Sequence, residues 1–388
     1  MRFHPFWCAL VLATSSACAS AAPAPHANAS STAVPARYLY VWAGDKDGKS
    51  SDFLAVVDVN RDSKDFGQVV TTVPVGMSGS LPHHMEYSLP GQGQFARLAN
   101  GHVLVGYLRS EGPSPLPGDS TNPGGHGGIA ELDGAGQMIR SASAADPGSR
   151  IPVRVYAFAL RPDIDRMLTT SAPMMEDTSA DVVQIWRMSD FKLLRTLPVP
   201  PALLPDGSVL PTGHGYPFEP RVMPDGSVLL NAYGCGFYRV TGLGSDAPDF
   251  RNVHTIDVRS AGKRMGACGI PIVVGHYWIM AVGRLSALVT LDIRDPAHPV
   301  ETSRLHADST FHPHWMARDP GSDRIIVGAE NGGENRMLMA KVDSTTGRVS
   351  WDRSLHSADG ALGISFVRAT WPHGETGEAF GHAALFRP

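Results

Sequence analysis

The chain has 388 residues, of which 43% are hydrophobic and 18% are charged, and its formal net charge at pH 7 is -4. This size is enough to bury a full core in one large domain or two smaller ones. The sequence has no basic stripe of the kind that nucleic-acid-binding proteins present, so we expect no nucleic-acid partner.

The N-terminal segment is typical of an exported protein. Residues 1–22 carry one basic residue, an apolar run and then small residues, which predicts a secretory signal peptide. The Pro-, Ala- and Ser-rich residues 23–35 predict a disordered leader, so the folded domain is expected to span residues 36–388. The apolar run is too short to cross a bilayer, so no transmembrane span is expected. We predict a periplasmic or secreted protein; a lipid anchor at Cys18 is the alternative that the sequence favours less.

The rest of the chain is dominated by turn-and-strand patterns. The fragment PDGSVL occurs at 205–210 and at 224–229, and ANGHVLVGYL (99–108) has the same form. Asp-Gly and Asn-Gly followed by alternating apolar residues are typical of hairpin turns that lead into strands. No segment keeps apolar residues at helical spacing for three turns. The sequence therefore predicts an all-β fold.

These strands group into six countable units. The units begin at YLYVWAG (38–44), near Leu81, at VYAFALRP (155–162), at EPRVMPDG (219–226), at GIPIVVG (269–275) and at HPHWMARDP (312–320). A period of roughly 40–60 residues with about four strands each predicts a β-propeller of six or seven blades, with a pair of β-sandwiches as the competing architecture. The first unit lacks an innermost strand, and GHAALF (381–386) is expected to supply it and close the ring.

Histidines recur at the starts of the predicted innermost strands, which a propeller brings together at its axis. Imidazole is a suitable ligand for copper, zinc or iron, so we predict a metal site there. Strand alternation points His84 and His314 toward the axis and His83 and His312 away from it. His84 and His314 are therefore the favoured metal ligands, and the last strand adds His373 and His382 to the histidines expected near the axis.

Two carboxylates are candidates for orienting the ligand imidazoles. Glu86 follows the His83–His84 pair, and Glu219 begins the fourth unit. Either could accept the second ring N–H of a ligand histidine. For Glu219 the alternative is a structural ion pair with Arg221, and any single histidine can instead be a buried, hydrogen-bonded core residue.

After removal of the leader, two cysteines remain. In an exported protein Cys235 and Cys268 can form a disulfide, and two buried free thiols are an equally acceptable interpretation. A third possibility is that Cys268 binds the metal as a thiolate, which a disulfide would prevent.

Several of these fragments together resemble a known family. LPHHMEY, FARLANGH, NAYGCGFYRVTGL, ALVTLDIRDPAHPVE, PHWMARDP and WPHG are similar to segments of bacterial proteins of the selenium-binding protein and methanethiol oxidase family. The resemblance implies a seven-bladed propeller that binds copper and oxidises methanethiol to formaldehyde, hydrogen sulfide and hydrogen peroxide. It also implies His84, His314 and His382 as ligands, with His83 and His373 less strongly indicated.

The chain departs from the family pattern in one place. Here HHMEY and FARLANGH follow each other directly, whereas relatives separate them by about one blade, so the chain lacks about one blade and one ligand strand.

The sequence thus supports two functions. The first is an exported, metal-dependent oxidase of a small thiol such as methanethiol, with copper as cofactor and zinc or iron not excluded. The alternative is a non-catalytic propeller that binds a metal, a small ligand or a protein partner. A lactonase is less favoured, because its calcium site would need Asp, Glu and Asn rather than His at the axis.

Overall fold

The computed structural model describes residues 34–80, 92–93, 95–109, 125–149, 151–174, 178–261, 265–330, 334–357 and 360–387. All of these residues belong to one compact unit, Ser31–Pro388. The predicted signal peptide and almost all of the predicted leader lie outside the described residues.

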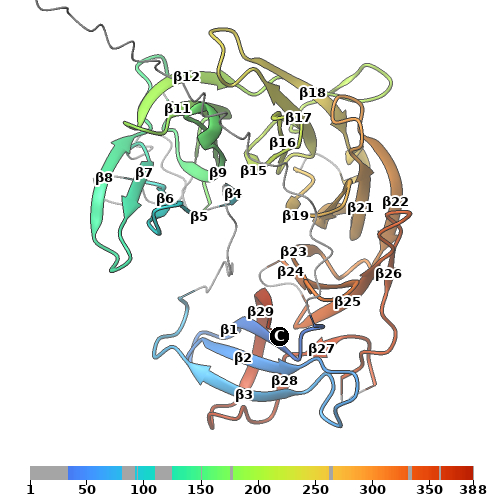
Figure 1. Cartoon of the computed structure of the whole chain (residues 1–388). Coiled ribbons are helices and arrows are strands. Elements are labelled where there is room, and N and C mark those ends of the chain that lie inside the picture. The colour runs from blue at the N-terminus through green and yellow to red at the C-terminus, as the bar shows by residue number, and fades with distance from the viewer. Residues whose placement is uncertain are drawn as a thin grey trace, which may run out of the picture. The chain divides into compact units, whose positions relative to one another are not determined.

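The described chain forms six antiparallel sheets of four or five strands, which we number 1 to 6 (Figure 1). Sheet 1 has the order β28 (Val367–Arg368), β29 (Gly377–Arg387), β1 (Tyr38–Asp45), β2 (Phe53–Asp58), β3 (Val69–Pro74). Sheet 2 has the order β5 (Phe95–Arg97), β6 (Val103–Tyr107), β7 (Gly128–Leu132), β8 (Met138–Ser143). Sheet 3 has the order β12 (Lys192–Pro198), β11 (Val182–Arg187), β10 (Arg166–Ser171), β9 (Val155–Arg161), β4 (Gln92–Gly93).

The remaining sheets follow in chain order. Sheet 4 is β15 (Pro217–Val222), β16 (Val228–Ala232), β17 (Gly236–Thr241), β18 (Asp249–Thr255). Sheet 5 is β19 (Cys268–Val274), β20 (Tyr277–Val282), β21 (Ala287–Asp292), β22 (Val300–His306). Sheet 6 is β23 (Pro313–Arg318), β24 (Arg324–Ala329), β25 (Arg336–Val342), β26 (Val349–Trp351), with β27 (Ile364–Ser365) also on β25.

Short elements complete the described chain. A separate ribbon pairs β13 (Ala202–Leu203) with β14 (Val209–Leu210), and three 3-10 turns are η1 (Pro162–Ile164), η2 (Arg259–Ala261) and η3 (Gly283–Leu285). No helix in the described part of the chain is long and apolar enough to cross a membrane. The all-β prediction is therefore confirmed, and six propeller-like sheets match the six units counted in the sequence.

Asp-Gly and Asn-Gly turns form the hairpins as expected. Gly207 and Gly226 both have φ of +80°, and Gly101 has φ of +85°. A left-handed backbone conformation has little steric cost for glycine, which is why these turns carry it. In the β15–β16 hairpin the amide of Gly226 donates a 2.9 Å hydrogen bond to the carbonyl of Met223.

The two ends of the described chain pair in sheet 1. β29 runs antiparallel to β1, with Tyr38 opposite Arg387 and Asp45 opposite Ala379. The prediction that GHAALF supplies the missing innermost strand of the first unit is confirmed.

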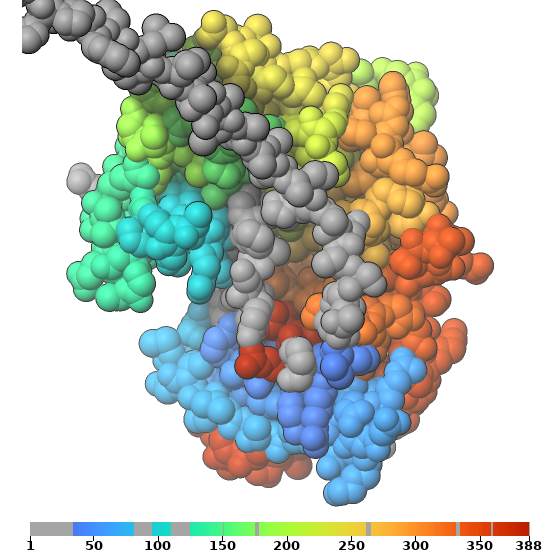
Figure 2. Space-filling model, in the orientation of Figure 1, coloured from blue at the N-terminus to red at the C-terminus, as the bar shows by residue number. Residues whose placement is uncertain are grey.

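Neighbouring sheets pack through apolar faces, and their innermost strands contact one another in the series β9, β15, β19, β23, β29. Sheet 2 joins this series through β9. Among the described strands, no contact of similar extent joins sheet 1 to sheet 2. The space-filling view shows a notch between the surfaces of these two sheets (Figure 2). The described strands of sheets 1 and 2 therefore do not pack against each other as those of the other neighbouring sheets do.

A buried ion pair links sheet 6 to the start of sheet 1. Arg324 Nη2 donates to Asp319 Oδ2 at 2.6 Å and to the carbonyl of Ala36 at 2.9 Å. The guanidinium of Arg324 also donates to the carbonyl of Val59. Burial alone would raise the pKa of Asp319, but hydrogen bonds from Ser322, Arg324 and two backbone amides lower it below its ordinary value.

Candidate functional site

The innermost strands of five sheets share one irregularity at an equivalent level. In sheets 1, 3, 4, 5 and 6 the register between the innermost strand and its neighbour shifts, and each time the innermost strand carries one residue more. The residues at these shifts are Tyr156–Ala157, Phe218–Glu219, Gly269–Ile270, His314 and His382–Ala383. A β-bulge of this kind redirects side chains and is frequent beside functional sites.

Side chains at these bulges meet in one small cluster, which we call the axial cluster. Its members are Tyr156, Ala157, Ala172, Phe218, Ile270, Trp315 and Ala383, with Trp42, Met174, Tyr216 and Tyr233 partly buried against them. The rings of Tyr156 and Phe218 stack at 4.2 Å between centroids, and Phe218 and Tyr233 lie 5.8 Å apart. The axial cluster therefore joins side chains from sheets that are distant in sequence.

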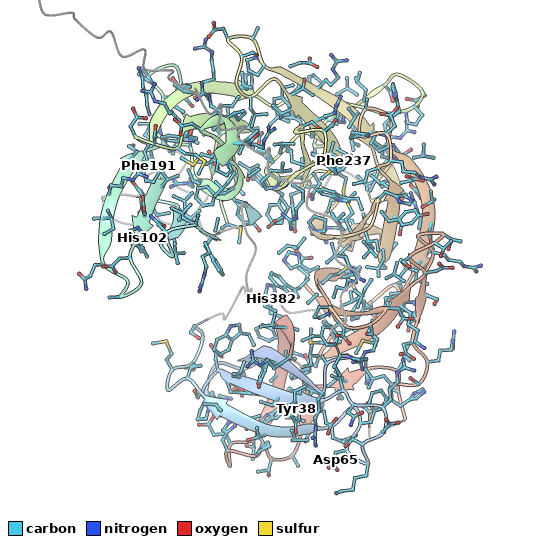
Figure 3. The ribbon with its side chains drawn as sticks, viewed as in Figure 1. Tyr38, Asp65, His102, Phe191, Phe237 and His382 are labelled. Atoms are coloured by element: carbon cyan, nitrogen blue, oxygen red, sulfur yellow. A yellow bond between two sulfur atoms is a disulfide. The ribbon has the colours of Figure 1, made fainter. Side chains whose placement is uncertain are left out.

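His314 and His382 lie side by side at the edge of this cluster. Their ring centroids are 5.2 Å apart and the ring planes are inclined by 37°. His314 is 8% exposed and His382 1% exposed. His382 extends from β29 toward the middle of the group of sheets (Figure 3). Trp315 donates from Nε1 to the carbonyl of Ala384 at 3.3 Å, which fastens β23 to β29 beside the pair.

The surroundings of His314 affect the pKa of its ring in two opposite ways. Burial lowers the pKa of His314, and the negative charge of Glu330 acts in the opposite direction. Glu330 accepts a 3.0 Å hydrogen bond from the hydroxyl of Tyr233, and its backbone amide donates to the carbonyl of His312 at 2.8 Å. Burial and the charge of Glu330 raise the pKa of the Tyr233 hydroxyl well above its usual value. A neutral imidazole is the form that binds a metal, and a lowered pKa favours that form.

The other predicted ligand histidines lie elsewhere or outside the description. His83, His84 and Glu86 fall in residues 81–91, which are outside the described residues. His373 does not join His382: its Nδ1 lies 2.6 Å from Thr72 Oγ1 on β3, the outermost strand of sheet 1.

The segment between β28 and β29 carries His373 to the outer strand of sheet 1. Gly374, which follows His373, has φ of +97°, and Gly377, the first residue of β29, has φ of +115°. The expectation that His373 stands at the start of an innermost strand is therefore wrong.

His312 and Glu219 take structural partners. His312 Nδ1 is 3.0 Å from the carbonyl oxygen of Gly283, so this ring is held by the neighbouring sheet. Glu219 is fully buried and its Oε2 accepts a 2.8 Å hydrogen bond from Arg221 Nη1. The ion pair named as the alternative for Glu219 is thus present.

Cys235 and Cys268 are joined by a disulfide, with 5.2 Å between their Cα atoms. Both residues are buried. The disulfide leaves Cys268 without a thiolate, so the interpretation of Cys268 as a metal ligand is wrong.

The fit of a metal ion to the site can be tested on the described side chains. His314 and His382 offer two neighbouring imidazoles, which is the donor type that copper, zinc and iron accept. Among the described residues, no group of three or more His, Cys, Asp or Glu side chains is arranged to hold a metal. The described part of the chain therefore contributes a two-histidine pair, and the predicted third ligand, His84, lies outside it.

Three side chains near the pair escaped the sequence interpretation. Trp42 lies opposite the bulge of β29, and Tyr233 and Glu330 connect sheets 4 and 6 beside His314. Glu330 lies in the glycine-rich segment GAENGGEN, which resembles an ordinary loop. The only signal for Tyr233 was its place in the family-like fragment NAYGCGFYRVTGL.

Comparison with known proteins supports the fold. No family model matches the sequence, and no curated protein matches it either. A hypothetical selenium-binding protein from Sulfolobus tokodaii is similar in structure, with 13% identity, 91% of this chain and 94% of that chain covered, and a TM-score of 0.66. The periplasmic gluconolactonase PpgL of Pseudomonas aeruginosa has 13% identity, with coverage of 90% and 99% and a TM-score of 0.53. At such identities the likeness establishes a β-propeller fold and leaves the chemistry to the site.

Proposed function

We propose that this protein is an exported propeller that binds a transition-metal ion, copper in the first place, through His314 and His382 and uses it to oxidise a small thiol. The observation that carries the proposal is the pair of buried imidazoles, 5.2 Å apart, which come from β23 and β29.

Packing around the pair supports a metal-binding role. Both histidines occupy register shifts, so their ring positions follow from the backbone rather than from a flexible loop. Burial lowers the pKa of His314, and the hydrogen bond from Trp315 to the carbonyl of Ala384 joins the two strands. A pair of ligands on rigid strands is a preorganised half of a metal site.

The axial cluster suits a small, weakly polar substrate. Tyr156, Phe218 and Trp315 supply apolar surface near the histidine pair and would exclude water from a bound thiol. A bound copper ion would supply a position for the substrate sulfur and a route for two electrons to O2. Methanethiol, O2 and water would then give formaldehyde, hydrogen sulfide and hydrogen peroxide, a balanced reaction.

The buried disulfide supports export. Disulfides persist in the periplasm and outside the cell and are rare in the cytosol. The Cys235–Cys268 bridge and the signal-like N-terminal sequence favour the same compartment.

Metal content provides the decisive experiment. The protein would be purified from the periplasm or culture medium, stripped with a chelator and titrated with Cu(I), Cu(II) and Zn(II). We expect stoichiometric binding by wild type, and a loss of affinity of at least about a hundredfold in His314→Ala and His382→Ala, since even residues that only orient a ligand contribute ten- to a hundredfold. His276→Ala is the control, because His276 follows the far end of β19.

Measuring hydrogen peroxide formation then distinguishes a metal-dependent thiol oxidase from a propeller that binds metal without catalysis. Adding methanethiol and O2 to the loaded protein should give peroxide with wild type and with His276→Ala. If metal binds without any peroxide, the oxidase half of the proposal fails and a non-catalytic metal-binding propeller remains. If wild type binds no metal, the site itself is refuted.

A further inference from the structure

A polar network lies between sheets 4 and 5. It contacts β19, and β19 in turn packs against β23, the strand that carries His314. Asn231 on β16 is fully buried, and its Nδ2 donates to the carbonyls of Cys268 and Gly269 at 3.0 and 3.2 Å. Arg221 donates through Nη1 to Glu219 at 2.8 Å, and its Nη2 lies 3.5 Å from the carbonyl oxygen of Pro271.

The bulge in β19 explains why this network exists. Cys268 pairs with Val282 and Pro271 pairs with Met280, so the residues between Cys268 and Pro271 fall out of register with β20. Buried carbonyls that leave a ladder need other donors. Asn231 supplies them, with a weaker contribution from Arg221, and the neighbouring sheet thereby fixes the irregular start of β19.

The same stretch of β19 touches the main chain of His314. A Cβ added at Gly269 would lie 2.4 Å from the carbonyl oxygen of His314, so the two backbones are in direct contact and only glycine fits. Any shift of the β19 bulge is therefore transmitted to the residue that carries the imidazole.

We propose that Asn231 is a positioning residue for His314, holding the bulge of β19 against the His314 backbone so that the ring stays in register with His382. This inference deepens the proposed function and rests on it. Glu219 acts on the β19 bulge less directly, because it holds the guanidinium of Arg221, which contacts the carbonyl of Pro271.

The chain offers a matched control for testing this. Asn252 on β18 also donates from Nδ2 to two carbonyls, those of Phe237 and His254, at 3.0 and 2.8 Å, and it also spans a register shift. It lies on the outer strand of sheet 4, away from β19. Asn231→Leu and Asn252→Leu thus remove the same kind of bond at different distances from His314.

Metal titration and NMR together decide the proposal. We expect Asn231→Leu to lower metal affinity about ten- to a hundredfold, the range for residues that orient a ligand, and Asn252→Leu to leave it within about twofold. In the metal-free protein, the ring nitrogen signals of His314, assigned with His314→Gln, should move in Asn231→Leu and stay in place in Asn252→Leu. If Asn231→Leu does not fold, Asn231→Ser removes the same donors and takes its place.

The two proposals can fail separately. If wild type binds no metal, the proposed function fails, while the NMR signals still test the positioning of His314. Equal changes in the two Asn variants, or none in either, would overturn the role of Asn231.

Discussion

The inner strands of sheets 3 and 4 and those of sheets 6 and 1 use the same backbone device for different purposes. In sheets 3 and 4 the bulge residues Tyr156 and Phe218 stack on each other at 4.2 Å. In sheets 6 and 1 the bulge residues His314 and His382 face each other at 5.2 Å. We call these the aromatic half and the histidine half of the site.

The difference shows how position and chemistry are specified separately. The register shift determines where in the site a side chain lies. The residue type then determines whether that side chain packs against apolar neighbours or offers a ligand atom. Apolar rings stabilise the centre by burial, whereas imidazoles in the same position offer nitrogen donors. Replacing an aromatic bulge residue should therefore mainly change the stability of the protein, whereas replacing a histidine at a bulge should mainly change its metal affinity.

The largest expected effect is on the aromatic half. Phe218→Ala should lower the free energy of unfolding by about 3–5 kcal/mol, the usual range for a buried phenylalanine. Metal affinity of the folded protein should stay within a few-fold of wild type. Urea unfolding and metal titration of the same sample check both; a loss of metal without a loss of stability would contradict the division into halves.

A second prediction gives the histidine half the chemistry of the aromatic half. His382→Phe keeps a buried ring at the bulge of β29 and removes both nitrogens, so metal affinity should fall at least about a hundredfold, which is about 2.7 kcal/mol. Stability should stay close to wild type because an aromatic ring of similar shape remains. Calorimetric titration and thermal unfolding give the two numbers, and unchanged metal binding would show that His382 is not a ligand.

Steric pressure on the backbone provides a third, smaller effect. Gly269→Ala would force β19 and β23 apart, because its Cβ would come within 2.4 Å of the His314 carbonyl oxygen. We expect a loss of about 1–3 kcal/mol in stability and a measurable loss in metal affinity. Gly134→Ala is the control, since no atom lies within 4 Å of a Cβ at that position. Identical behaviour of the two variants would mean that β19 does not restrain His314.

The smallest effect should be a dependence of stability on pH at the contact between sheet 6 and the start of sheet 1, the two sheets that carry the histidine half. Asp319 has a folded pKa below its ordinary value of 3.8, so its ion pair with Arg324 stabilises the protein above that pH. This contribution is lost as pH falls through the folded pKa. Urea unfolding between pH 5 and 2 should show a steeper loss of stability for wild type than for Asp319→Asn, and equal slopes would contradict the assignment.

Much of the fold could be predicted because its signals are local or topological. Asp-Gly turns mark the hairpins, and a first unit without an innermost strand required a partner from elsewhere in the chain, which β29 supplies. His314 and His382 were named as axial residues because both stand near the starts of the innermost strands predicted from the sequence, PHWMARDP and GHAALF. The structure brings these two together.

What could not be predicted depends on register shifts and turns. Strand alternation was used to distinguish His314 from His312, yet His314 is itself the extra residue of a bulge, where alternation no longer applies. His373 was misplaced because the segment between β28 and β29 runs beside β3, the outermost strand of sheet 1, rather than at the axis. Asn231 shows no motif, and its role depends on a bulge in a different sheet.

The pairing of β29 with β1 makes the site depend on a contact between distant parts of the sequence. His382 lies in β29, and this strand must find its partner β1 across the whole series of intervening sheets. Contacts between such distant residues form late and slowly during folding. A chain in which β29 has not paired with β1 would lack both a complete sheet 1 and the position of His382 beside His314.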